Sequence, residues 1–237
     1  PEYLKKNEII MRNVIYHNSG NASNYVIASS NSMKNEFINF MKIKKSKIIQ
    51  INEGVDKINS LKTKNNRKKQ RYFFYPAQFW EHKNHRNLIK AFHLLQKKIK
   101  NINLILVGAE KNNLKDVTNE ILDLNLSEKI FILGYVDEED MYSFYKKASL
   151  TSFVSFCGPT NIPPLESMYV GCPLICSKVY AMKSQVKNGG LFINPNSQND
   201  IYKKMLSILK NKKIRDKIVK NRLKKTKKNQ NIKFLRS

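Results

Sequence analysis

From residue 71 onward, the sequence alternates short apolar runs with stretches of helical periodicity, and this alternation constrains the fold most strongly. The apolar runs predicted as strands are Tyr72–Tyr75, Ile102–Val107, Ile130–Leu133, Leu150–Val154, Pro173–Cys176 and Leu191–Ile193. The predicted helices are Leu88–Ile99, Leu114–Leu124, Glu138–Lys147, Pro164–Val170 and Asp200–Leu209. Strands that alternate with helices through short connections form a parallel sheet with helices on both faces. We therefore predict a doubly wound α/β domain over residues 71–210.

Three further regions flank or precede this domain. Residues 1–56 contain a predicted strand, helix and strand at Tyr25–Ser29, Met33–Met41 and Ile48–Ile51, a βαβ piece too small to bury a core alone. Residues 57–70 are rich in lysine and asparagine and are predicted to be a basic linker. Residues 211–237 are predicted to be a basic C-terminal helix and tail.

The net charge of +26 suggests nucleic-acid binding, but the type of basic residue and its place in the sequence argue against that function. Lysine supplies 37 of the 44 basic residues, whereas specific base recognition favours the bidentate fork of arginine. The excess lies mostly at the two ends, and residues 203–237 carry 15 basic residues and one acidic residue. We therefore expect no specific nucleic-acid partner. A basic tail does attract polyanions, including an anionic membrane surface.

Cysteine and acidic residues give no sign of a metal site. The three cysteines are odd in number, and a lone C-x3-C lacks the second pair of ligands that zinc needs, so burial as small apolar side chains is expected. Free thiols fit a reducing compartment, most simply the cytoplasm. The acidic run Asp137–Asp140 fits the first turn of a helix better than a metal site. Glu81, His82 and His85 do not form H-E-x-x-H.

The stretch that carries chemistry runs from Phe156 to Ile175. A strand ends near Val154, and Pro163 and Pro164 then open a helix, because proline fits the first helical turn. The free amides and positive dipole end of that helix suit a phosphate. Glu166 is predicted in the first turn, where its carboxylate could accept hydrogen bonds from a ribose. It could equally do no more than complement the helix dipole, and the residues alone leave both readings open.

The segment P-P-L-E-S-M-Y-V-G-C-P-L-I-C-S resembles the donor-binding segment of retaining GT-B glycosyltransferases of family 4, also known as glycosyl transferases group 1. Further elements of that family follow in order. Tyr75–His85 resembles its first C-terminal strand and loop, and Leu106–Gly108 and Leu133–Val136 resemble its next two strand ends. Ile27–Ser30 and Glu53–Asp56 resemble the elements where its N-terminal domain passes into the linker.

The resemblance implies roles for individual residues. Lys83 corresponds to the lysine that binds the donor diphosphate, although a solvated lysine would be the default among so many. Glu166 corresponds to the second glutamate of E-x7-E, which holds the ribose. The first glutamate would fall at Gly158 and is absent, as in a branch of the family with the form G-P-T-N-I-P-P-L-E. The other implied donor-binding residues are Gln78, where many members carry arginine, Gly108 and Val136 at the base, Thr160, Asn161 and Ile162 at the diphosphate, and Leu165 beside Glu166. His85 is a weaker candidate for a phosphate contact.

For the whole chain, the resemblance implies a Rossmann-like donor-binding domain preceded by the end of the N-terminal acceptor domain. The expected activity is transfer of a hexosyl group, with retention, from a nucleotide-diphosphate sugar to a hydroxyl of a glycan or lipid-linked acceptor, without a metal or cofactor. The setting would be cell-envelope polysaccharide synthesis in the cytoplasm, at the inner face of the membrane. The resemblance identifies no catalytic residue here, and because the N-terminal domain would be incomplete, donor binding is expected rather than turnover. The alternative is a non-catalytic protein that binds polyanions or membrane surfaces through its basic ends.

Overall fold

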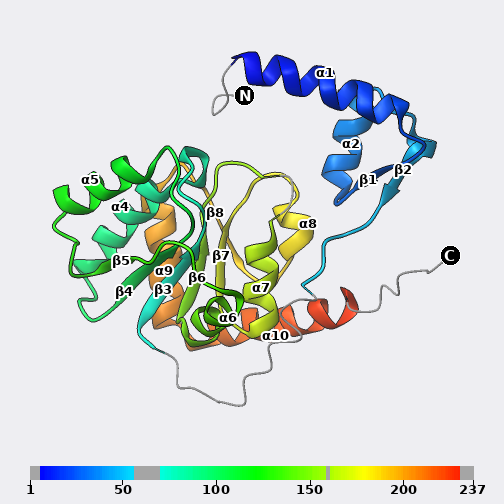
Figure 1. The fold of residues 1–237 in the computed structure, drawn as a ribbon. Coiled ribbons are helices and arrows are strands. Elements are labelled where there is room, and N and C mark those ends of the chain that lie inside the picture. The colour runs from blue at the N-terminus through cyan, green and yellow to red at the C-terminus, as the bar shows by residue number, and fades with distance from the viewer. Residues whose placement is uncertain (1–5, 56–69, 159–160, 230–237) are drawn as a thin grey trace.

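The computed structural model describes residues 6–55, 70–158 and 161–229, with side chains as far as residue 221. A small N-terminal unit is followed by a larger domain built on a central sheet (Figure 1). Nearly all of the predicted basic linker at residues 57–70 lies outside the described residues, and the predicted division into domains stays a prediction.

The central sheet confirms the predicted fold class. Its six parallel strands are β3 (Tyr72–Pro76), β4 (Asn103–Val107), β5 (Ile130–Ile132), β6 (Leu150–Phe153), β7 (Leu174–Ser177) and β8 (Leu191–Ile193). Their spatial order is β5-β4-β3-β6-β7-β8. The chain therefore moves outward in one direction from β3 and in the other from β6. In such sheets, ligands bind outside the carboxyl ends of the strands at this reversal point.

Helices cover both faces of the sheet because side chains on a strand alternate between them. The helices of this domain are α4 (His85–Gln96), α5 (Leu114–Asp123), α6 (Glu138–Lys147), α7 (Ile162–Val170), α8 (Met182–Val186), α9 (Gln198–Lys210) and α10 (Lys212–Asn229). Phe73 and Tyr75 pack in one core cluster with α4, α5 and α9. Tyr72 and Phe74 pack in a second cluster with α6. Figure 1 shows α6 and α7 on the near side of the sheet.

The last long helix, α10, runs along α7 and α9, and its Ile218 is buried against the core. The predicted C-terminal helix is therefore present and lies on the domain rather than apart from it. No helix within the described ranges is long and apolar enough to cross a membrane.

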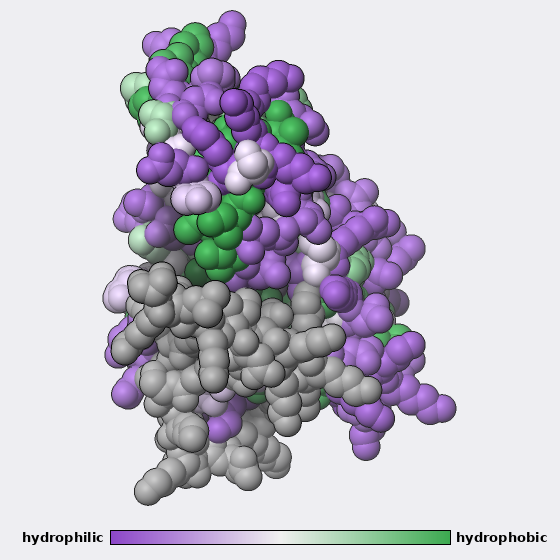
Figure 2. Space-filling view, turned by 90° about the vertical axis from the view of Figure 1, so that its right-hand side faces the viewer, coloured by the Kyte–Doolittle hydropathy of each residue, from purple (hydrophilic) through white to green (hydrophobic). Residues whose placement is uncertain are grey.

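The N-terminal unit contains α1 (Lys6–Ala22), β1 (Val26–Ala28), α2 (Asn31–Asn39) and β2 (Ile48–Gln50). β1 and β2 pair in parallel as predicted, and Ala28, Ile43 and Ile48 form a small core. Helix α1 was not predicted, since its apolar residues do not gather on one face. Several large apolar side chains of this unit are exposed: Ile10, Met11, Val14, Ile15, Tyr25, Ile27, Phe40 and Ile49. Figure 2 shows apolar residues at the surface on the side of the molecule that carries the unit.

Candidate functional site

A cavity of about 310 Å³ lies at the carboxyl ends of β3, β4 and β5, beside the start of α7. It therefore occupies the reversal point of the strand order. The residues that line it are Pro76, Ala77, Gln78, Val107, Gly108, Tyr135, Val136, Asp137, Glu138, Met141, Tyr142, Pro163 and Glu166. Four of the residues implied by the family resemblance thus meet in one place, although they come from three loops and one helix: Gln78, Gly108, Val136 and Glu166.

Gly108 makes part of this wall from bare backbone. A Cβ atom at this position would lie 2.3 Å from the carbonyl oxygen of Ala77 and 2.7 Å from the amide nitrogen of Gln78. The amide of Ala77 donates to Val107 O at 2.8 Å, and the amide of Gly108 donates to Gly134 O at 2.8 Å. The loops after β3, β4 and β5 are therefore locked together at a separation that admits only glycine at position 108.

Glu166 lies in the second turn of α7, so its predicted place in the first turn was wrong. Because the helix dipole acts mainly within the first turn, a role in complementing the dipole does not account for Glu166. Its Oε2 instead accepts a hydrogen bond of 2.7 Å from the hydroxyl of Tyr145 on α6. Burial raises the pKa of Glu166, and burial together with the nearby carboxylate raises the pKa of Tyr145 well above its usual value. The hydroxyl therefore stays protonated and holds the carboxylate at the cavity.

The raised pKa of Glu166 gives a test by pH. In the folded chain, Glu166 keeps its proton at pH values where an unfolded glutamate has lost it. Its contribution to stability is therefore complete below the usual pKa of 4.5 and is lost as pH rises through the folded pKa. Glu166→Gln should remove this decline. In urea unfolding between pH 4 and 8, the stability of this variant should therefore rise relative to that of the wild type as pH increases.

Tyr145→Phe is the matched variant for this test. Because the Tyr145 hydroxyl lowers the pKa of Glu166, its loss should raise that pKa and move the decline in stability to higher pH. A pH dependence identical in the wild type and in Glu166→Gln would contradict the assignment.

Lys83 ends a short 3-10 turn, η2 (Glu81–Lys83), in the connection between β3 and α4. It does not line the 310 Å³ cavity. Its Nζ lies 5.6 Å from the ring centroid of Phe153, at the end of β6, and burial lowers the pKa of Lys83. The structure therefore brings this lysine to the neighbouring side of the same reversal point, as a partly buried cation rather than a solvated one.

The start of α7 is tied to α8 through one side chain. The amide of Asn161 donates to Gln185 Oε1 at 3.3 Å, and Gln185 Nε2 donates to Asn161 O at 2.8 Å. Asn161 is buried, whereas Ile162 is half exposed. Thr160, the other residue expected at the diphosphate, lies outside the described residues.

Leu165 faces away from the main cavity and lines a second one of about 250 Å³. The other residues around this second cavity come from the N-terminal unit, from α8 and from the residue that follows α8: Ser29, Ser30, Asn31, Gln50, Asn52, Glu53, Ser184, Gln185 and Lys187. The structure thus separates Leu165 from its neighbour Glu166 across the helix.

The structure gives a physical reason for Gly158 in place of a glutamate. A Cβ at Gly158 would lie 2.7 Å from Oδ1 and 2.8 Å from Nδ2 of Asn161, and φ is +144°. The Asn161 side chain, which also donates to Met182 Sδ at 3.4 Å, thus occupies the space that a larger residue at 158 would need. The glycine and the asparagine are a packed pair.

The weaker candidates are core or capping residues. His85 is fully buried, its ring stacks on Phe79 at 4.6 Å, and burial lowers its pKa to about 3, so it is neutral and cannot reach a phosphate as a cation. Glu138, Glu139 and Asp140 lie in the first turn of α6, as predicted for the acidic run, and Asp137 caps the helix by accepting from the amide of Asp140 at 2.8 Å. Within the described residues no cluster of His, Cys, Asp and Glu could hold a metal ion. Cys172 and Cys176 are buried as expected, and Cys157 is half-buried.

Sequence reasoning missed several residues of the site. Tyr145, which holds Glu166, and Met141 and Tyr142, which line the cavity, all come from α6. The helical period predicts that Met141 and Tyr145 share a face, four residues apart, but it does not show which loop that face meets.

Known proteins share this fold and, more weakly, this sequence. HepE of Anabaena, solved in complex with UDP and glucose, superposes with a TM-score of 0.81 at 16% identity over 97% of this chain and 64% of that chain. The C-terminal domain of LpcC from Francisella tularensis, a glycosyl transferase group 1 family protein, superposes with a TM-score of 0.62 at 20% identity over 70% of this chain and 89% of that domain. These likenesses show the GT-B type of fold.

Two curated proteins are similar in sequence. The O-antigen chain mannosyltransferase RfbU of Salmonella typhimurium is 27% identical over 176 residues, which cover 73% of this chain and 48% of RfbU. The O-antigen chain mannosyltransferase B of Escherichia coli is 29% identical over 141 residues, covering 59% of this chain and 37% of that protein. The chain thus spans about half or less of these relatives. Residues 56–225 match the family described as Glycosyl transferases group 1. On that match, which takes in the whole central sheet and its cavity, the chain belongs to the glycosyl transferases group 1 family.

Proposed function

We propose that this chain is the donor-binding part of a retaining GT-B glycosyltransferase of family 4, in the branch with the G-P-T-N-I-P-P-L-E motif. The observation that carries the proposal is the 310 Å³ cavity at the reversal point of the sheet, where Gln78, Gly108, Val136 and Glu166 meet. Concave sites of this size at this position of an α/β sheet suit a nucleotide.

Different residues around the cavity suit the base and the ribose of a nucleotide sugar. The backbone wall at Gly108 and Val136 lets a flat base approach closely, because no side chain intervenes at Gly108. Glu166, held by Tyr145, accepts hydrogen bonds from the ribose hydroxyls. Gln78 donates from its side-chain amide, and its Oε1 accepts from Trp80 Nε1 at 2.9 Å, which fixes the orientation of the amide.

The diphosphate belongs with Lys83 and the start of α7. A partly buried ammonium and the positive end of a helix stabilise the negative charge that develops on the leaving nucleoside diphosphate. In the transfer, the bond between C1 of the sugar and the β-phosphate oxygen breaks. A new bond forms from C1 to the acceptor oxygen on the same face of the sugar, and the proton of the acceptor hydroxyl passes to the β-phosphate oxygen of the departing nucleoside diphosphate. This charge stabilisation from the protein takes the place of a metal, so we propose that no metal or cofactor is needed.

The names of the relatives guide the rest of the proposal. RfbU and the mannosyltransferase B of Escherichia coli are named for O-antigen chains, so we propose a hexosyl donor, a glycan or lipid-linked acceptor and a role in cell-envelope polysaccharide synthesis. We place this role in the cytoplasm, at the inner face of the membrane. Because the chain spans about half of these relatives, the acceptor site would depend on further N-terminal structure that completes the β1-α2-β2 unit.

The proposal is tested by a ligand screen. Thermal-shift and calorimetric titrations with UDP, GDP, ADP and dTDP and their sugars should single out one base. A ligand at 100 times its Kd should stabilise the chain by about 2.7 kcal/mol, or roughly 5–11 °C in melting temperature for a chain of this size. Equal or absent responses to all four bases would refute the proposal.

The same titrations distinguish the alternative, a polyanion- or membrane-binding protein. Lys212, Lys213 and Lys217 are exposed along α10, so peripheral contact with an anionic membrane is part of our proposal. Binding by charge alone would fall steeply with salt for every polyanion and would not distinguish bases. Vesicles with and without anionic lipid test the membrane contact separately, mixed with the full chain, with a chain lacking residues 224–237 and with a full chain in which Lys212, Lys213 and Lys217 are changed to glutamine.

A further inference from the structure

We propose that Asn84 is the positioning residue for Lys83, acting as a buried clamp that sets where the lysine ammonium stands relative to a bound diphosphate. This inference rests on the proposed function, because it concerns the same site. Asn84 follows Lys83 directly in sequence and is 4% exposed.

The side chain of Asn84 joins three separate parts of the domain. Its Nδ2 donates to Val154 O, at the end of β6, at 2.9 Å, and to Pro195 O, in the connection after β8, at 2.8 Å. These partners lie 70 and 111 residues away along the chain. A single buried amide thus fixes the turn that carries Lys83 against the strand end that carries Phe153, on which Lys83 packs.

Asn84 does not perform the ordinary role of its position. It is the N-cap of α4, where an asparagine side chain usually accepts a hydrogen bond from a helix amide while the backbone is extended. Here the side chain makes no capping bond, and the backbone is left-handed, with φ 63° and ψ 35°. The side chain of Asn84 thus makes its hydrogen bonds across the domain rather than to the amides of α4.

Other hydrogen bonds hold the same turn from β3 and from the residues that follow β6. The hydroxyl of Tyr75, on β3, donates to Lys83 O at 2.5 Å. The hydroxyl of Ser155 donates to His82 O at 3.0 Å, and the amide of Phe156 donates to His82 O at 2.8 Å. The backbone on both sides of Lys83 is therefore fixed, and the ammonium can move only through its own side-chain torsions. Fixing a charged group in advance of binding reduces the cost of ordering it when the ligand arrives.

The test uses Asn84→Gly, because glycine accepts the left-handed backbone and removes only the clamp. The probes are UDP, GDP, ADP and dTDP with the matching monophosphates, titrated by calorimetry. We expect Asn84→Gly to weaken binding of the preferred base's diphosphate by about tenfold, which lies within the range of coupling energies between residues in contact. The affinity for the matching monophosphate should change by no more than about twofold. In a Lys83→Met background, Asn84→Gly should cause no further loss of diphosphate affinity. This non-additivity separates positioning of Lys83 from a general structural effect.

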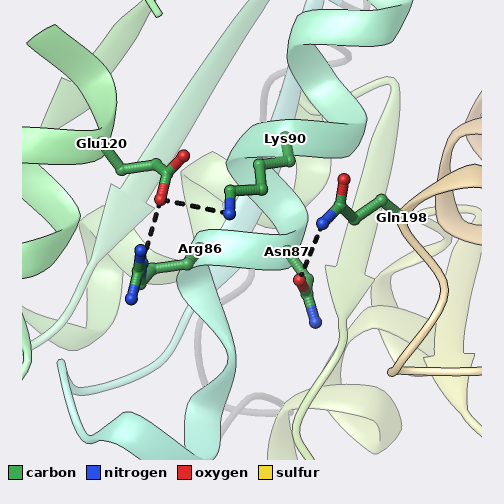
Figure 3. A network of polar contacts seen from close by, with 5 residues as sticks. All are labelled: Arg86, Asn87, Lys90, Glu120 and Gln198. Carbon is green, nitrogen blue, oxygen red and sulfur yellow. Dashed lines mark hydrogen bonds and ion pairs between the residues drawn. The ribbon is translucent and has the colours of Figure 1, made fainter. Parts of the chain in front are cut away.

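The matched control is Asn87→Ala. Asn87 also donates to Pro195 O, at 3.1 Å, and accepts from Gln198 Nε2 at 3.4 Å (Figure 3), but it lies one turn further along α4 and does not adjoin Lys83. The Asn87→Ala variant should have a lower melting temperature but an unchanged ratio of diphosphate to monophosphate affinity. A second variant, Tyr75→Phe, removes a single hydroxyl and should change that ratio severalfold in the same direction, also without effect in the Lys83→Met background.

Three outcomes overturn the inference. These are an unchanged ratio in both Asn84→Gly and Tyr75→Phe, an equal change in Asn87→Ala, or losses that add to that of Lys83→Met. If Lys83→Met itself leaves diphosphate affinity unchanged, or no diphosphate binds, the proposed function fails and the inference fails with it. A large effect of Lys83→Met with no effect of Asn84→Gly or Tyr75→Phe refutes the inference and leaves the proposed function standing.

Discussion

Replacing Lys83 with methionine is expected to weaken binding of the preferred nucleoside diphosphate by about 10- to 150-fold, because a hydrogen bond to a charged group contributes about 1.5–3 kcal/mol. Methionine keeps an apolar stem that can pack on Phe153, so the variant removes the charge and leaves most of the packing. Calorimetric titration of the diphosphate and monophosphate measures the effect, which should fall mainly on the diphosphate.

The pKa of Lys83 adds an independent signature. Burial lowers this pKa below its usual value of 10.5, and the ammonium is the form that attracts phosphate. Diphosphate affinity should therefore fall as pH rises through the lowered pKa, and this fall should be absent in Lys83→Met. Lys111→Ala is the control. The ammonium of Lys111 lies 5.3 Å from the centroid of the Trp80 ring, so it is a second cation beside the loop that carries Lys83. Equal losses in both variants would indicate a general charge effect rather than a site.

Gly108→Ala should be the most destabilising single substitution at the cavity. The new Cβ would lie 2.3 Å from a backbone oxygen, and backbone cannot turn away as a flexible side chain can. The loops after β3 and β4 must then separate, at a cost of about 3 kcal/mol, the upper part of the usual range for overpacking. That cost corresponds to a fall of roughly 6–12 °C in melting temperature. Diphosphate binding should fall with it, because Gln78 moves with the displaced loop.

Gly134→Ala is the matched control for this prediction. Gly134 follows the neighbouring strand β5 and has φ +67°, but a Cβ there would meet no atom within 4 Å. Its cost is therefore conformational only, about 1–2 kcal/mol, and the cavity should keep its shape. Comparable melting temperatures for the two variants would show that the close approach at Gly108 does not constrain the loops.

The periodicity of the sequence was enough to predict the α/β fold and most element boundaries. Glu138–Lys147 and Leu191–Ile193 coincide with α6 and β8, and other predicted elements begin or end within a few residues of the observed ones. The reason is that apolar spacing reflects burial on a helix face or a strand, which is a local property. Helix α1 escaped prediction because only Gly20 among its residues is buried, so its apolar residues follow no single face.

Identifying the site required both the local sequence motifs and the tertiary structure. A resemblance in local motifs selected Gln78, Gly108, Val136 and Glu166, and the order of the strands then brought them around one cavity. The sequence alone placed Glu166 in the first turn, which was wrong, and it did not show that His85, a weaker candidate for a phosphate contact, is buried against Phe79. Helix boundaries shift by a few residues, and burial against Phe79 is a contact that the local sequence does not encode.

The sequence by itself thus determined the class of fold, the family motifs and the basic ends, since each is written in neighbouring residues. Only the tertiary structure decided that Tyr145 holds Glu166, that Gly158 makes room for Asn161, and that Asn84 clamps the turn of Lys83 to β6 and to the connection after β8. Such contacts join residues that are distant along the chain, so they exist only once the parallel sheet has brought its strand ends to one edge.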